Sequence, residues 1–315
     1  MKKLIAFVLL TCMILTLAAC GGKESTPPKD TTPESTAPES TTPESTMPEI
    51  TAQFLYDAGK IPELLKKHDS VYLVHTENGE VYEEEYFSNE CYYTFYGYNE
   101  YEYALFSTAH SHYMYFEDKY ERVIVVSPDG LLDLESLFAE DLDRNIFTDS
   151  LLNDTVTSVI EKDGQIIVTS VPDREELDTY EAEGWSLGKE ETVLDAKTFD
   201  VIFERADYTE IETGEVYEGA INITYDGEIP ESMKKFVEYD TQTENMRTVT
   251  VVTNPGGDNE KTESLQVPKG LQVTFSGLAD EETPYTLYTD AECTQAFEEE
   301  ADTDSDLTIY VKWGE

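Results

Sequence analysis

Two histidines spaced two residues apart, His110 and His112, are the first candidates for chemistry in this chain. On a strand, residues i and i+2 point to the same side, so the two imidazoles would face a common ion. A zinc site takes three or four ligands, and Glu102, Glu117 or Asp118 would have to complete the set. Exposed, neutral histidines are the alternative, and we expect neither a metal nor another cofactor.

The stretch Gly184-Trp185-Ser186-Leu187-Gly188 has the spacing of a hydrolase nucleophile turn, in which a serine follows a strand and precedes a helix. The surroundings do not fit, because a charged segment precedes it and a strand pattern follows it. All four histidines lie upstream, whereas the turn needs an acid and then a histidine downstream. We therefore expect no enzymatic activity, and predict that Trp185 packs in the fold.

The segment Asp302-Thr303-Asp304-Ser305-Asp306 imitates the start of a calcium-binding loop. Such a loop needs Gly at its sixth position and Glu at its twelfth, where this chain has Leu307 and Trp313. The sequence therefore predicts a solvated turn.

Tyrosines are concentrated between residues 92 and 120. A tyrosine ring buries apolar area while its hydroxyl stays hydrated, so a row of them suits contact with a glycan, peptide or protein. The alternative is a cross-strand aromatic ladder that supports an antiparallel sheet. The candidate contact residues are Tyr92, Tyr96, Tyr101, Tyr103, Tyr113 and Tyr115.

The first twenty residues have the parts of a secretory signal. Lys2 and Lys3 precede an apolar run of about 14 residues, too short to span a ~30 Å hydrocarbon layer permanently. Two alanines and Cys20 follow. This end resembles the lipobox of bacterial lipoproteins, and the resemblance implies that residues 1–19 are removed and Cys20 is diacylated. An ordinary signal peptide with a chance cysteine is the alternative.

A diacylated cysteine would fix the protein to the cell membrane by its lipid, facing the extracytoplasmic side. The net charge of −46 excludes binding to nucleic-acid backbones and disfavours docking on anionic lipid head groups. The expected partners are therefore the membrane, through the N-terminal lipid, and an apolar ligand or a cell-wall or surface partner.

Residues 20–50 repeat Pro-Glu-Ser-Thr at Pro33, Pro38 and Pro43, which predicts an extended, disordered tether. Beyond it, Cys91 and Cys293 are far apart. A disulfide between them is one possibility, and two single thiols are the interpretation that we favour.

Residues 51–244 read as one α+β domain, mainly antiparallel. A helix is expected over 51–68, with shorter helices near 131–138, 172–182 and 230–236. Asn78-Gly79 and Asp163-Gly164 predict hairpin turns. Strands are expected at 71–75, 81–87, 91–95, 100–106, 112–116, 122–126, 156–160, 166–171, 192–195, 199–205 and 216–225.

The strand–turn–strand pattern of residues 193–201 resembles bacterial lipoprotein carrier-like proteins. The resemblance implies a half-barrel sheet that curves over packed helices and shelters an acyl-chain cavity.

Residues 245–315 end in Tyr310-Val311-Lys312-Trp313, and carry Tyr288-Thr289-Asp290 and Cys293 before it. This pattern resembles the internalin B-repeat, also called the Listeria–Bacteroides repeat, with Leu287 where that family has a tryptophan. The resemblance implies a small β-grasp-like module that spaces or makes weak contacts. The predicted function is a membrane-anchored lipoprotein that binds an apolar or envelope-derived ligand. The alternative is a surface adhesin or structural envelope protein.

Overall fold

The computed structural model describes residues 68–98, 101–132, 134, 155–172, 174–277, 284–298 and 302–314. The signal, Cys20 and the tether lie outside these residues, as do the expected helix over 51–68 except His68 and most of the expected helix near 131–138. All described residues belong to one compact unit, which spans residues 49–315.

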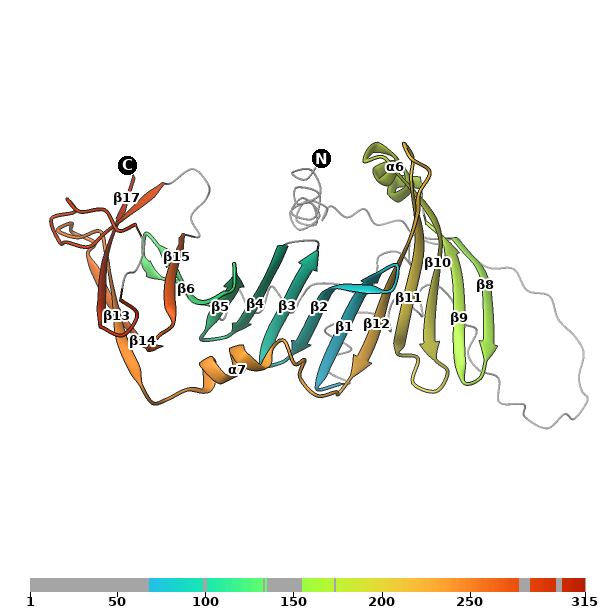
Figure 1. Ribbon diagram of the computed structural model, residues 1–315, viewed down its shortest axis with the longest axis horizontal. Coiled ribbons are helices and arrows are strands. Elements are labelled where there is room, and N and C mark those ends of the chain that lie inside the picture. The colour runs from blue at the N-terminus through green and yellow to red at the C-terminus, as the bar shows by residue number, and fades with distance from the viewer. Residues whose placement is uncertain are drawn as a thin grey trace, which may run out of the picture. The chain divides into compact units, whose positions relative to one another are not determined.

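A large, open sheet dominates the described residues, and its strand path is β15-β6-β5-β4-β3-β2-β1-β12-β11-β10-β9-β8, with β7 paired to β6 (Figure 1). Neighbouring strands run antiparallel except β15 and β6, which are parallel. The strands of this sheet are β1 (Ser70–Glu77), β2 (Glu80–Ser88), β3 (Cys91–Tyr98), β4 (Tyr101–Thr108), β5 (His112–Phe116), β6 (Lys119–Ser127), β7 (Gly130–Leu131), β8 (Thr155–Lys162), β9 (Gln165–Val171), β10 (Trp185–Asp195), β11 (Val201–Glu210), β12 (Val216–Tyr225) and β15 (Gln272–Gly277).

Two tight hairpins confirm the turn predictions. Asn78 and Gly79 join β1 to β2 with φ values of 51° and 82°, and Asp163 and Gly164 join β8 to β9 with 54° and 82°. Both central positions of such a turn need positive φ, which Asn, Asp and Gly tolerate. Each hairpin therefore fixes the register of its two strands locally.

A second sheet has the order β14-β13-β17-β16. Its strands are β13 (Met246–Thr253), β14 (Lys261–Pro268), β16 (Tyr285–Tyr288) and β17 (Leu307–Trp313), of which β13 and β17 are parallel. All four strands follow residue 245, at which we expected a second domain to begin. However, β15 lies beyond that boundary in sequence and pairs with β6, so one C-terminal strand belongs to the first sheet.

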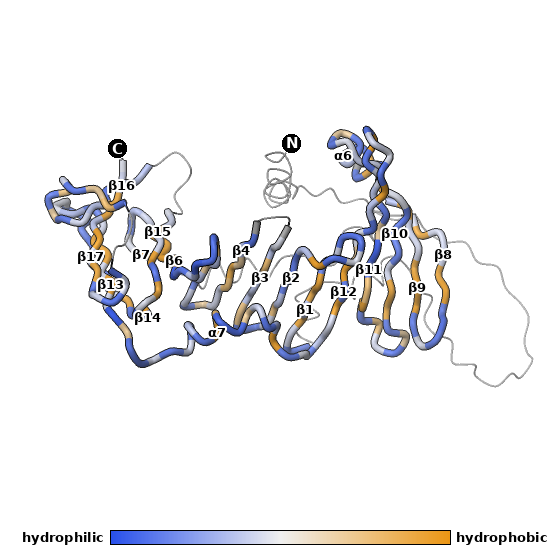
Figure 2. Tube along the Cα trace, in the orientation of Figure 1, coloured by the Kyte–Doolittle hydropathy of each residue, from blue (hydrophilic) through white to orange (hydrophobic). Residues whose placement is uncertain are grey.

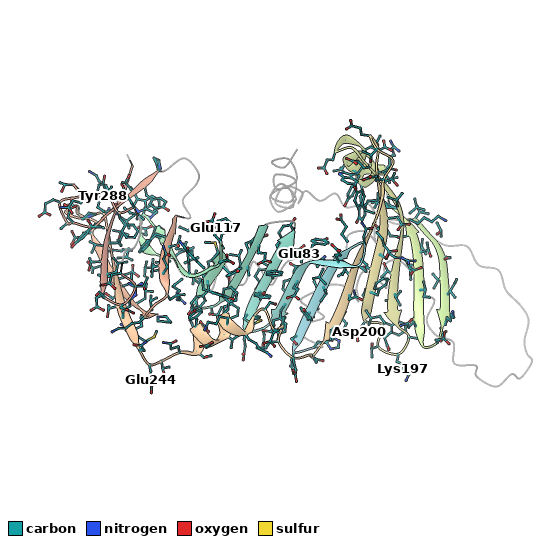
Figure 3. All side chains as sticks on the ribbon, viewed as in Figure 1. Glu83, Glu117, Lys197, Asp200, Glu244 and Tyr288 are labelled. Carbon is teal, nitrogen blue, oxygen red and sulfur yellow. The ribbon has the colours of Figure 1, made fainter. Side chains whose placement is uncertain are left out.

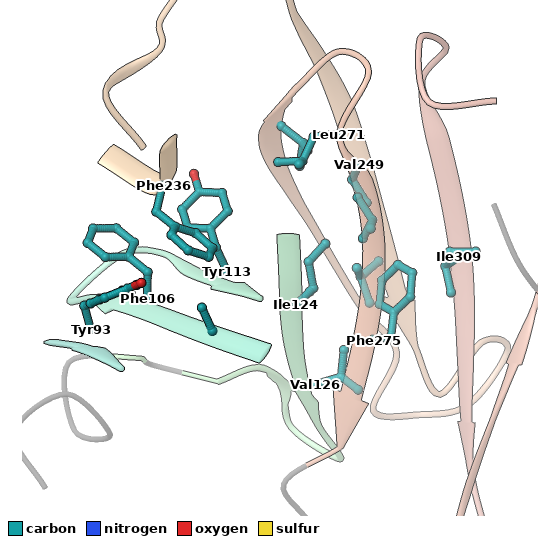
Figure 4. Close-up of a cluster of buried hydrophobic side chains, with 14 of the residues drawn as sticks. Tyr93, Phe106, Tyr113, Ile124, Val126, Phe236, Val249, Leu271, Phe275 and Ile309 are labelled. Carbon is teal, nitrogen blue, oxygen red and sulfur yellow. The ribbon is translucent and has the colours of Figure 1, made fainter. Parts of the chain in front are cut away.

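The main apolar core is continuous between the two sheets (Figure 4). Ile124 and Val126 on β6 pack with Phe275 on β15, and this group continues to Val249 and Ile309 in the second sheet. Arg247 is also buried, and its guanidinium donates to the carbonyl oxygens of Ser305 (3.2 Å) and Leu271 (3.0 Å). Its side chain therefore ties β13 to two loops.

Two helices are present in the described residues, α6 (Arg174–Ala182) and α7 (Lys234–Thr241). Pro230 was expected to open the last helix, but residues 230–233 form a turn and the helix begins at Lys234. The described fold is thus mainly antiparallel β, as predicted, and it has fewer helices than the expected α+β domain. The first sheet is open, because β15 and β8 end its path without pairing to each other.

Candidate binding site of tyrosines and carboxylates

The strands β1 to β4 carry a row of polar side chains across one face of the first sheet. Directly opposite residues in an antiparallel ladder share a face. His75 lies opposite Glu83, Glu83 opposite Tyr96, and Tyr96 opposite Tyr103. The row continues in the other direction, because His75 lies opposite Ile221 on β12 and Ile221 lies opposite Glu204 on β11. Figure 3 labels Glu83 on β2.

The side chains of this row contact one another and their neighbours. His75 Nε2 and Glu85 Oε2 lie 3.2 Å apart. The ring of Tyr82 lies 6.1 Å from that of His75 and 6.2 Å from that of Tyr96, edge to face in both cases. Tyr96 stacks on Tyr103 at 5.5 Å. We call this group the acid–tyrosine cluster, and its members are His75, Tyr82, Glu83, Glu85, Tyr96, Tyr103 and Glu204.

Burial changes the protonation of the cluster. Burial, assisted by the charge of Glu85, raises the pKa of Glu83 to about 7. Burial likewise raises the pKa of Glu204 to about 7. Burial alone would lower the pKa of His75, but its hydrogen bond with Glu85 and the surrounding carboxylates raise it. The cluster therefore gains negative charge as the pH rises through about 7.

This combination of groups suits a particular ligand chemistry. The face of a tyrosine ring is negative and attracts a cation within about 6 Å, most strongly when the cation is desolvated. The half-buried carboxylates attract the same cation by their negative charge. The bound cation in turn favours the ionised form of these carboxylates. An organic cation, such as an ammonium group with an apolar body, would satisfy both rings and carboxylates.

The six tyrosines predicted as contact residues divide between the two faces of the sheet. Tyr92, Tyr96 and Tyr103 share the face of the acid–tyrosine cluster. Tyr92 is buried, and its hydroxyl donates to Glu85 Oε1 at 3.5 Å. The backbone of Tyr101 lies in β4, and its side chain is outside the described part.

Tyr113 and Tyr115 lie on the opposite face. Tyr113 is 3% exposed, lies under the Arg122 guanidinium at 4.6 Å, and stacks on Tyr239 of α7. Tyr115 is half-buried, packs against Tyr120 at 4.8 Å, and donates its hydroxyl proton to Asp118. These two rings form part of a cross-strand aromatic packing arrangement.

The opposite face of β2 to β6 is filled where α7 covers it. Phe236 is 1% exposed, and its ring lies 5.9 Å from Tyr93 and 5.9 Å from Phe106 (Figure 4). Tyr120 contacts the same ring at 5.1 Å. These aromatic rings therefore pack together between α7 and this face of the sheet.

The sequence candidates for catalysis and metal binding are not brought together. Ser186 is exposed and lies in β10, after helix α6, which reverses the strand-then-helix order of a nucleophile turn. Trp185 packs edge to face on Tyr217 at 5.5 Å.

The two histidines of the metal hypothesis differ in environment. His110 is exposed, whereas His112 is within 2.6 Å of the Ser107 hydroxyl, and burial followed by the Arg122 charge lowers its pKa to about 4. In the described residues, no set of three or more His, Cys, Asp or Glu side chains lies close enough to hold a metal ion.

The aspartate-rich segment forms a turn. Asp302 accepts hydrogen bonds from the Asp304 amide and the Ser305 hydroxyl, and Asp306 accepts one from the Thr248 amide of β13. The carboxylates are thus used to fix the turn and attach it to the second sheet. Cys91 and Cys293 are both free thiols, as we favoured.

The sequence did not single out the carboxylates of the cluster, nor His75. Their one signal is Glu83-Glu84-Glu85 in the middle of a strand, where glutamate is depleted. In a chain with 67 acidic residues this signal is hard to separate from the background.

No family model matches the chain, and no curated protein matches it. Among solved structures, the lipoprotein LppX of Mycobacterium tuberculosis covers 56% of this chain and 97% of its own, with 9% identity and a TM-score of 0.34. That score is too low to transfer any property from LppX. No helix in the described residues has the length and apolar character to cross a membrane.

Proposed function

We propose that this protein is a lipid-anchored, extracytoplasmic binding protein whose acid–tyrosine cluster takes a ligand that bears an organic cation. The observation that carries the proposal is the cross-sheet row from Glu204 through His75 and Glu83 to Tyr96 and Tyr103. Its rings supply apolar contact and its carboxylates supply charge, so the ligand would combine an ammonium group with apolar parts.

The ligand proposal is tested by purifying the protein from its native membrane and analysing bound small molecules by mass spectrometry. An amine-bearing molecule that disappears in the Tyr96→Ala variant supports the proposal. A neutral acyl lipid retained equally by wild type and Tyr96→Ala would instead support an enclosed apolar ligand.

The second candidate is a surface adhesin or structural envelope protein that contacts protein or glycan. It is favoured by the packing of the tyrosine-rich strands β3 to β5 on α7, where Tyr93 and Tyr113 belong to the main core and do not line a ligand site. Lysine side chains of a partner protein would present the cation. A lysine-rich peptide that binds more tightly than a free amine of equal charge would favour this candidate.

The anchor is tested separately with Cys20→Ser in the producing cells. Loss of both acyl chains should release the protein from the membrane, because no second lipid attachment is expected. Membrane fractionation and the mass of the N-terminal peptide measure this. Full retention of the variant at the membrane, or an N-terminal peptide without lipid in the wild type, would remove this part of the proposal.

A further inference from the structure

The last strand of the large sheet, β8, has an exposed edge. The strand path of the described residues ends at β8, which pairs with β9 along Thr155–Lys162. Six of its eight residues are exposed, and Val159 and Ile160 are 45% and 54% exposed. An edge strand offers unpaired N–H and C=O groups, and natural proteins usually protect such strands with charge, proline or cover.

The other strands that end a sheet path differ from β8. β15 and β14 each contain buried residues, and β16 has only four residues, of which one, Thr286, is exposed. β8 is also rich in β-branched residues, which favour an extended conformation. It therefore combines length, exposure and strand propensity in a way that the other terminal strands do not.

Charge distinguishes β8 within this strongly acidic chain. Residues 155–160 carry no charge, and Glu161 and Lys162 cancel at the hairpin end. β9 behind it, Gln165–Val171, carries no charge either. Two copies of a chain with a net charge of −46 repel each other over most of their surface, but this edge does not contribute to that repulsion.

We propose that β8 is a self-association edge, at which β8 of one copy pairs antiparallel with β8 of a second copy. A twofold pairing keeps equivalent faces together, so Val159 and Ile160 of each copy lie near their equivalents at the centre. The two sheets then become continuous, and the acidic remainder of each copy points away from the other. We favour a second copy because two acidic chains can pair only at an edge that is free of net charge, as β8 is. A partner protein of another charge would not require such an edge.

The first test is a cysteine scan in the full chain, in its own membrane. Single cysteines at positions 157 to 161 are oxidised with copper–phenanthroline. The protein without an added cysteine shows how much cross-linking occurs through Cys91 and Cys293. We expect covalent dimers that peak at one position of β8 and fall on both sides. Val216→Cys is the matched control, because Val216 is 62% exposed at the start of β12, an interior strand of the same sheet. Absence of a peak, or equal cross-linking at Val216, overturns the proposal.

The second test is the dissociation constant of the detergent-solubilised full chain, measured by sedimentation. Screening of acidic repulsion should tighten the dimer as salt rises from about 20 mM to about 500 mM. Ile160→Lys should weaken it by about a hundredfold, because like charges would meet at the pairing edge. Val216→Lys should leave it unchanged. A monomer at all salt concentrations, or a dimer that Ile160→Lys does not weaken, contradicts the proposal; circular dichroism confirms that both variants fold.

Discussion

The two faces of strands β2 to β5 differ in the groups that they carry, although the same tyrosine-rich segment supplies both. One face packs on α7, and the other carries the acid–tyrosine cluster. On one face, Tyr93, Phe106 and Tyr113 are buried and pack on Phe236 and Tyr239 of α7. On the other face, Glu83, Tyr96 and Tyr103 line up beside His75. Side chains alternate between faces along a strand, so neighbouring tyrosines enter different environments.

Residues of different hydropathy follow one another along the strands (Figure 2). Tyr93, Phe106 and Tyr113 belong to the same core cluster as Phe236 of α7. The other face combines half-buried glutamates with buried apolar residues of a second core, among them Leu73 and Phe87. A face that keeps half-buried carboxylates costs stability, because burial disfavours their charged form. That cost is consistent with a binding role for the cluster.

Among the substitutions that test the two faces, Phe236→Ala should cause the largest loss of stability. It removes the ring that fills the α7 face, so we expect a loss of about 4 kcal/mol in the free energy of unfolding. Urea denaturation followed by circular dichroism measures it. The matched control is Phe116→Ala, since Phe116 is 43% exposed and its truncation should change stability by less than about 0.5 kcal/mol. Similar losses in both variants would show that α7 does not bury a core face.

Glu204→Gln should stabilise the protein increasingly as the pH rises. The folded carboxyl keeps its proton up to about pH 7, whereas the unfolded one releases it near 4.5. The unfolded state therefore binds fewer protons between these values, and wild-type stability falls with rising pH there. Glutamine does not titrate, so its advantage over glutamate should grow by about 2 kcal/mol between pH 5 and 8.

Unfolding of wild type and Glu204→Gln at a series of pH values measures this difference. Glu218→Gln, on the neighbouring strand β12, is the control because Glu218 is exposed. If the Glu204→Gln advantage were the same at pH 5 and pH 8, the carboxyl would not be held in a buried, neutral form.

Tyr96→Ala should have a smaller effect on stability and a clear effect on binding. Loss of one ring of the acid–tyrosine cluster should weaken binding of choline about tenfold, which is about 1.4 kcal/mol. Isothermal titration calorimetry measures the affinity. Tyr115→Ala removes a half-buried ring from the opposite face and should leave choline affinity unchanged; an equal loss in both variants would place binding elsewhere.

Local features of the fold could be predicted from sequence. The Asn78-Gly79 and Asp163-Gly164 turns have the predicted positive φ values, and β5 and β12 cover the expected residues. Long-range pairings could not be predicted, because the edge that a strand joins depends on contacts distant in sequence. The pairing of β1 with β12, and of β15 with β6, are examples.

The candidate site was predictable only in part. Strand periodicity correctly places Tyr113 and Tyr115 on one face, since they lie two residues apart on β5. It cannot say that Tyr96 and Tyr103 occupy the other face, because that depends on the lengths of the intervening turns. His75 and Glu204 meet on one face through β12, and no local pattern in the sequence connects them.

The most direct test of the binding proposal is a pair of probes that differ in charge alone. Choline and its neutral carbon isostere, 3,3-dimethylbutan-1-ol, are titrated into the protein while the ring resonances of the tyrosines are followed by NMR. We expect choline to shift the resonances of Tyr96 and Tyr103, more strongly at pH 8 than at pH 6, while the neutral isostere has little effect. Equal shifts with both probes, or choline shifts confined to tyrosines of the α7 face, would contradict the proposal.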